Sequence, residues 1–87
     1  MTRPEDVVDA VADWLHIPAT MILEAGRSVP LPSFRRVAAH AAHELTPWSW
    51  EDVAGLFGAD RQWLARTLNP VERLLLERFR VEWEGRR

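Results

Sequence analysis

The chain has 87 residues, of which 47% are hydrophobic and 28% are charged, and it contains no cysteine. This size fits one domain over residues 1–87, and the hydrophobic content excludes a disordered chain. The lack of cysteine excludes a disulfide framework and a thiolate metal site. No apolar run is long enough to span a membrane and no signal peptide opens the sequence, so we expect a cytoplasmic protein.

The formal charge is −2, and it is unevenly distributed along the chain. Residues 1–26 hold five acidic residues and one arginine, and residues 44–60 hold four acidic residues and no base. Residues 27–43 hold three arginines and no acid, whereas residues 61–87 hold seven arginines and four acids. If the two positive blocks meet in space, they form a local basic surface. The alternative is that these charges only solvate helix faces.

The first two predicted helices lie within residues 2–26. Thr2 and Glu5 have the spacing of a capping box, and apolar residues then recur at helical spacing to about Leu15. A short helix follows from Pro18, and Gly26 can end it in a left-handed cap.

The clearest amphipathic pattern follows a loop predicted from Arg27 to Pro32. Its apolar positions are Phe34, Val37, Ala38, Ala41, Ala42 and Leu45. They repeat every three or four residues, which predicts one buried helical face. Because most of these side chains are small, we expect other helices to approach this one closely.

Three more helices are expected after Thr46-Pro47. Ser49 caps the first of them, Asp60 caps a short second one, and Asn69-Pro70 starts the last, which ends at Gly85. Gly58 supplies the sharp turn between the first two. The last helix is predicted to bury Val71, Leu74, Leu75 and Phe79. The chain is therefore predicted to form a compact all-α bundle of about six helices. Its core is predicted to comprise Phe34, Val37, Ala38, Ala41, Leu45, Val53, Leu56, Phe57, Leu64, Leu68, Leu75 and Phe79.

Several of these features occur together, without a gap, between Arg27-Ser28 and Phe57-Gly58. Arg35 stands near the start of the long helix, Glu44-Leu45-Thr46 ends it, and Ser49 and Val53 follow. With this spacing, residues from about 5 to 68 resemble the C-terminal DNA-binding domain of the bacterial replication initiator DnaA. The resemblance implies a helix-turn-helix fold of the Trp-repressor-like group.

The resemblance also implies roles for individual residues. Arg27 matches a loop arginine that enters the minor groove, where a guanidinium can respond to groove width. Arg35 matches a basic position near the phosphate backbone, and we place Arg36 and Arg66 at phosphates as well. Ser49 matches a helix N-terminus that can hold a phosphate. As alternatives, Arg35 is an ordinary exposed arginine and Ser49 a plain cap.

The chain departs from the family after Phe57-Gly58. The family continues with Arg-Asp-His-Thr-Thr-Val, whereas this chain has Ala59-Asp60-Arg61-Gln62-Trp63-Leu64. Arg61 and Gln62 can read guanine and adenine edges. Trp63 is not a usual base reader, although it can contact a thymine methyl group, a sugar or a protein partner.

Five tryptophans are many for this length. Trp48, Trp50 and Trp63 surround the predicted turn, and together they predict either an exposed protein interface or side chains packed against the alanine-rich helix. His40, His43 and Glu44 share a helix surface, but without a further strong ligand they indicate a solvated or partly buried face rather than a metal site.

No nucleophile–base pair and no glycine-rich phosphate loop is present, so we expect no enzymatic activity, no cofactor and no bound nucleotide. Two functions follow from the sequence. The first is a small protein that binds double-stranded DNA and controls replication or transcription, for which a phage or mobile element is one setting. The second is a protein-interaction module that regulates a replication or transcription protein and has kept the fold without base readout.

Overall fold

The computed structural model describes residues 2–24 and 31–86, and six helices account for most of them. The helices are α1 (Pro4–Leu15), α2 (Ala19–Leu23), α3 (Leu31–Leu45), α4 (Trp50–Phe57), α5 (Arg61–Ala65) and α6 (Pro70–Gly85). These ranges contain no strand, which confirms the all-α prediction. None of the described helices combines the length and apolar character that crossing a bilayer requires.

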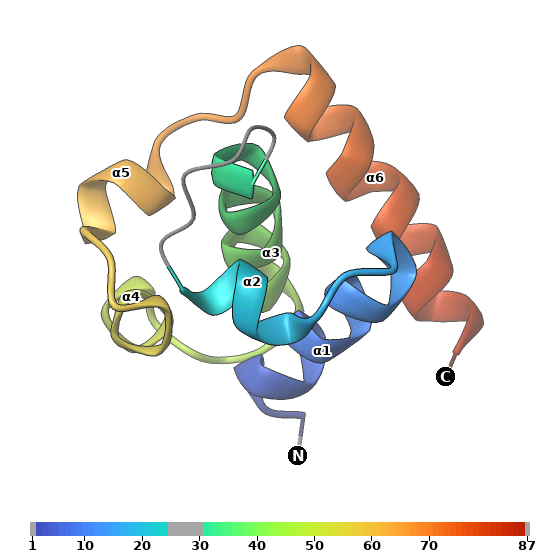
Figure 1. Cartoon of the computed structure of the whole chain (residues 1–87), viewed down its shortest axis with the longest axis horizontal. Helices are drawn as coiled ribbons and strands as arrows, with labels where there is room; N and C mark the ends of the chain where they lie inside the picture. Colours follow the sequence, from blue (N-terminus) through green and yellow to red (C-terminus); the bar gives the residue numbers. More distant parts are fainter. Residues whose placement is uncertain (1, 25–30, 87) are drawn as a thin grey trace.

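Helix α3 is the centre of the bundle and contacts each of the other five helices. In Figure 1 it runs through the middle of the molecule, with α4 and α5 on one side and α6 on the other. Four alanines on α3 are fully buried: Ala38, Ala39, Ala41 and Ala42. Their small side chains allow several helices to approach one backbone, as the sequence predicts.

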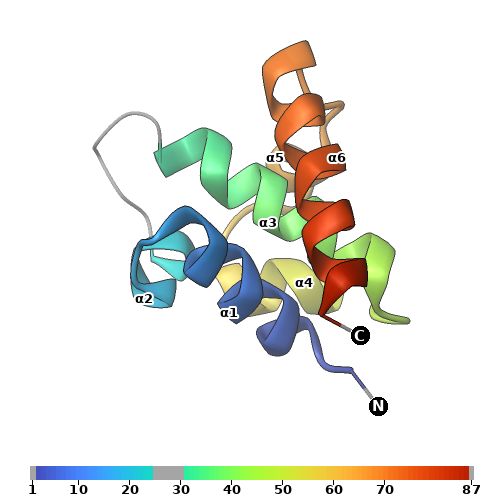
Figure 2. The ribbon, with the colours of Figure 1, turned by 90° about the vertical axis from the view of Figure 1, so that its right-hand side faces the viewer.

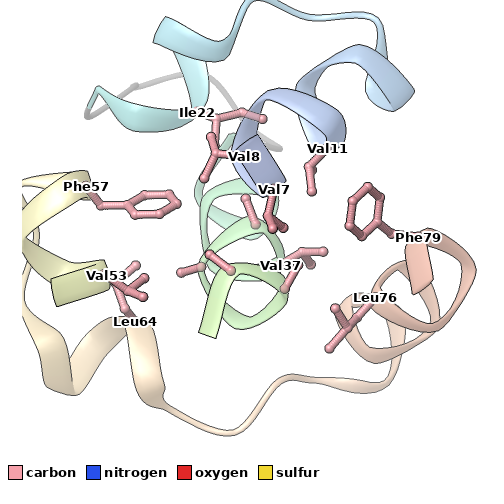
Figure 3. Close-up of a cluster of buried hydrophobic side chains, with 14 of the residues drawn as sticks. Val7, Val8, Val11, Ile22, Val37, Val53, Phe57, Leu64, Leu76 and Phe79 are labelled. Carbon is pink, nitrogen blue, oxygen red and sulfur yellow. The ribbon is translucent and has the colours of Figure 1, made fainter. Parts of the chain in front are cut away.

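One hydrophobic core joins all six helices (Figure 3). Val7, Val8 and Val11 of α1 meet Ile22 of α2 and Val37 of α3 at its centre. Most of the predicted core is buried, namely Val37, Ala38, Ala41, Val53, Phe57, Leu64, Leu68 and Phe79. The other four predicted members are only half-buried: Phe34, Leu45, Leu56 and Leu75.

The beginnings of α4, α5 and α6 confirm the predicted caps. The side chains of Ser49, Asp60 and Asn69 each accept a hydrogen bond from a backbone N–H in the first turn of the helix that follows. Gly58 has a φ of 58°, which a glycine adopts without strain. Local side-chain chemistry therefore sets these three boundaries.

Two predicted boundaries in the first half are wrong. Helix α1 begins at Pro4, one residue later than the Thr2–Glu5 box implies, and the backbone N–H of Arg3 donates to the Asp6 carboxylate. Helix α3 begins at Leu31, so the predicted loop ends earlier than Pro32. Proline is tolerated in a first helical turn because the N–H it lacks has no partner there. The predicted cap at Gly26 lies outside the described residues.

The predicted inner face of α6 is partly wrong. Val71 is 69% exposed and Leu74 is 51% exposed, whereas Glu72, Leu76 and Phe79 are buried. A charged residue holds the inner position nearest the start of α6, because Glu72 pairs with Arg36 of α3. The face that α6 buries therefore differs from the face predicted from its apolar residues, and Val71 and Leu74 point outward.

Candidate nucleic-acid interface

Helices α4 and α5 are joined by a short turn at residues 58–60. The N–H of Ala59 donates to the carbonyl of Ala54 at 3.2 Å, and the left-handed Gly58 then redirects the chain. Asp60 caps α5 immediately afterwards. Two helices joined by a short glycine-containing turn have the form of a helix-turn-helix connection.

Helix α5, which would have to read the bases, is very short. It has five residues, a length of about 8 Å at the usual rise per residue. The chain is non-helical from Arg66 to Asn69, and Pro70 begins the next helix. Proline cannot donate a helical hydrogen bond, and it disfavours helical geometry in the preceding residue. Arg61 and Gln62 are exposed in the only turn that α5 forms.

Arg35 is a buried structural residue, which corrects its predicted place at the phosphate backbone. Its residue exposure is 6%, and its guanidinium donates to the carbonyls of Ile22 at 2.8 Å, Leu23 at 3.1 Å and Phe57 at 2.8 Å. These carbonyls lie at the C-terminal ends of α2 and α4, where helical partners run out. Burial lowers the pKa of Arg35. A guanidinium held in this way does not face solvent.

Arg36 is also directed into the protein, which corrects its predicted phosphate contact. Its guanidinium donates to the Glu72 carboxylate at 2.9 Å and to the carbonyls of Arg66 at 2.7 Å and Thr67 at 3.0 Å. Only 12% of the Arg36 side chain and 3% of the Glu72 side chain are exposed. This arginine therefore fixes the segment between α5 and α6 to α3.

The remaining candidate residues lie in an acidic setting. Arg61 is exposed, and its guanidinium is paired with Glu51 at 3.2 Å. Ser49 caps α4, and its hydroxyl donates to the Asp52 carboxylate at 2.9 Å. A phosphate at the start of α4 would meet the carboxylates of Glu51 and Asp52. The side chains of Gln62 and Arg66 are exposed, and Arg27 lies outside the described residues.

The α4–α5 turn also borders an open hollow of about 490 Å³. Its lining consists of small residues and three charged ones: Glu51, Ala54, Gly55, Gly58, Ala59, Asp60 and Arg61. Two of the three charged residues are acidic. The hollow is therefore better suited to a neutral or basic protein side chain than to a phosphate.

The three tryptophans near the turn are half-buried and packed against the core. The ring of Trp50 is stacked on His43, with centroids 4.3 Å apart, and meets His40 edge-on at 4.9 Å. Trp63 has the guanidiniums of Arg35 and Arg36 each 5.9 Å from its ring centre. Trp48 is likewise packed against the core. These contacts support packing on the alanine-rich helix and disfavour a shared exposed aromatic patch.

The two histidines of α3 take part in internal contacts. His40 Nε2 lies 3.1 Å from the carbonyl of Arg66, and His43 Nδ1 lies 3.1 Å from the carbonyl of Trp48. Burial lowers the pKa of His40, although its backbone hydrogen bonds oppose this effect. Within residues 2–24 and 31–86 no group of three metal-ligating side chains comes together.

Sequence reasoning missed one surface, the outer face of α6. Val71, Leu74 and Val81 are all exposed there. These residues are three and seven positions apart, and such helical spacing fits a buried face as well as an exposed one. Which face of α6 is buried depends on Glu72, whose inward carboxylate pairs with Arg36 of the distant helix α3.

Comparisons with models of known protein families, with curated proteins and with solved structures found no match.

Proposed function

We propose that this protein is a non-catalytic protein-interaction module built on a helix-turn-helix-like framework. The observation that carries the proposal is the inward direction of Arg35 and Arg36. Both guanidiniums are bonded to the protein's own carbonyls, so a phosphate could bind them only at the expense of the fold. The resemblance to the initiator domain suggests a replication or transcription protein as the partner.

Electrostatics support the same conclusion. Within the described part of the α4–α5 region, the exposed bases are Arg61, which is paired with Glu51, and Arg66. Each neutralised phosphate contributes about −0.9 to the log–log salt slope of duplex binding. One or two contacts give a slope no steeper than about −2 and weak affinity. The carboxylates of Glu51, Asp52 and Asp60 reduce that affinity further.

DNA binding is the second candidate, and the α4–turn–α5 geometry favours it. The resemblance also assigns the minor groove to Arg27, so a duplex contact independent of Arg35 and Arg36 is chemically reasonable. A single inserted guanidinium favours narrow A·T-rich grooves. This second function therefore predicts a preference that Arg27→Ala removes.

Fluorescence anisotropy with labelled A·T-rich and random duplexes distinguishes the two functions. At about 50 mM salt, where screening is weak, we expect no saturable binding below about 10 μM protein. Binding at low micromolar concentration with a salt slope steeper than about −3 would overturn the proposed function. If Arg27→Ala then abolished an A·T preference, the DNA function would replace it.

A further inference from the structure

Helix α6 has a continuous outer face that nothing in the described protein covers. Val71 is 69% exposed, Leu74 is 51% exposed and Val81 is 73% exposed. In Figure 2 this helix runs along the side of the molecule that faces the viewer, away from α4 and α5. The face lies opposite Leu76 and Phe79, which are buried in the core.

The outer face has the spacing of a helix-pairing seam. Val71, Leu74, Arg78 and Val81 are separated by three, four and three residues, which places them at the a and d positions of a heptad. Arg78, in the middle, is exposed. Neither Arg78 nor the adjacent Glu77 forms an ion pair with another described residue.

We propose that a second copy of this chain covers this face by packing its own α6 antiparallel to the first. A parallel pair would place Arg78 against Arg78 of the second copy, and like charges in contact are destabilising. In an antiparallel pair, Val71 faces Val81 of the second copy and Leu74 faces the aliphatic stem of Arg78. Long arginine stems can pack on apolar surface while the charged end stays hydrated. The guanidinium of Arg78 can then pair with Glu77 of the second copy. The face is thus complementary to itself in charge as well as in shape.

The size of the face predicts a weak dimer. Helix α6 has 16 residues and is about 24 Å long. We expect one such helix pair to bury less than the roughly 1,200 Å² typical of stable complexes. We therefore expect dissociation at micromolar concentration and association toward the millimolar range.

This inference rests on the proposed function, since it names a second copy as one partner of the module. Because α4 and α5 lie on the other side of α3 (Figure 1), the dimer leaves the hollow beside the α4–α5 turn open.

Sedimentation equilibrium from about 10 μM to 1 mM tests the association. We expect Leu74→Arg to weaken it at least tenfold, because the new cation meets Arg78 of the second copy. Met21→Arg is the matched control, since Met21 is an exposed apolar residue on α2. A monomer at 1 mM, or an unchanged dissociation constant in Leu74→Arg, would overturn the inference.

Cysteine cross-linking tests the orientation, and the chain contains no cysteine of its own. We expect a mixture of Val71→Cys and Val81→Cys proteins to form the mixed disulfide, with little cross-linking of either protein alone. Efficient cross-linking of each variant to itself would show a parallel pair and contradict the antiparallel arrangement. Duplex binding is measured separately, so a monomer that does not bind DNA would refute this inference and leave the proposed function standing.

Discussion

Replacing Arg35 with alanine is the most direct test of its structural role. Its guanidinium connects α3 to the ends of α2 and α4 through three backbone carbonyls. In Arg35→Ala these carbonyls lose their donors and no side chain of similar size fills the space. We therefore expect a loss of stability rather than a loss of surface charge alone.

The magnitude follows from the two fully buried hydrogen bonds, to Ile22 and Phe57. A hydrogen bond from a charged group contributes about 1.5–3 kcal/mol to stability. Allowing for non-additivity, we expect Arg35→Ala to lower the free energy of unfolding by about 3–5 kcal/mol. A chain of this length has about 4–13 kcal/mol in total. The variant should therefore melt at least about 12 °C lower, since 1 kcal/mol corresponds to about 4–8 °C in a small domain.

Thermal and urea unfolding followed by circular dichroism measure this loss. Arg66→Ala is the matched control, because the Arg66 side chain is exposed and surface substitutions change stability by about 0.5 kcal/mol or less. If Arg35→Ala were as mild as Arg66→Ala, Arg35 would be a surface residue. The argument against its phosphate contact would then fail.

Three further outcomes are expected. Ala41→Leu should lower the free energy of unfolding by about 1–3 kcal/mol, because Ala41 is fully buried at a helix crossing; a neutral result in urea unfolding would refute this. Since the pKa of His40 is lowered by burial, stability should be complete above about pH 6.5 and fall below it as the folded state resists protonation. His40→Gln should flatten that dependence in melts at pH 5 and 7.5, and an unchanged slope would exclude His40 as its source. Glu51→Lys frees Arg61 and should raise duplex affinity at 50 mM salt more than Glu84→Lys, which makes the same charge change on α6; equal gains would mean that the acidic α4–α5 face does not limit DNA binding.

Much of the fold could be predicted because its signals are local. Ser49, Asp60 and Asn69 cap the helices that follow them, and this chemistry needs only neighbouring backbone groups. The alanine-rich face of α3 likewise predicts close helix packing from its own composition. These elements required no knowledge of distant partners.

The site was harder to predict because its decisive contacts are distant in sequence. Arg35 bonds to Phe57, and Arg36 bonds to Glu72, across separations that periodicity cannot detect. Arginine side chains are mostly exposed, so the sequence favours solvent or phosphate for both. The inward Glu72 then leaves Val71 on the outer face, although the apolar pattern alone favours burial.

The inward Arg36 and the shortness of α5 have a common structural cause. In a continuous helix, the carbonyls of Arg66 and Thr67 would accept from the N–H groups four residues later. Pro70 has no N–H, so the carbonyl of Arg66 would lack its donor. Arg36 and His40 of α3 donate to the carbonyl of Arg66 instead, and Arg36 also donates to the carbonyl of Thr67. The guanidinium of Arg36 thus stabilises the non-helical segment that follows α5. Pro70 and Arg36 therefore act together, because a continuous α5 would leave the carbonyl of Arg66 without a backbone donor, and a released Arg36 would leave the carbonyl of Thr67 without its side-chain donor.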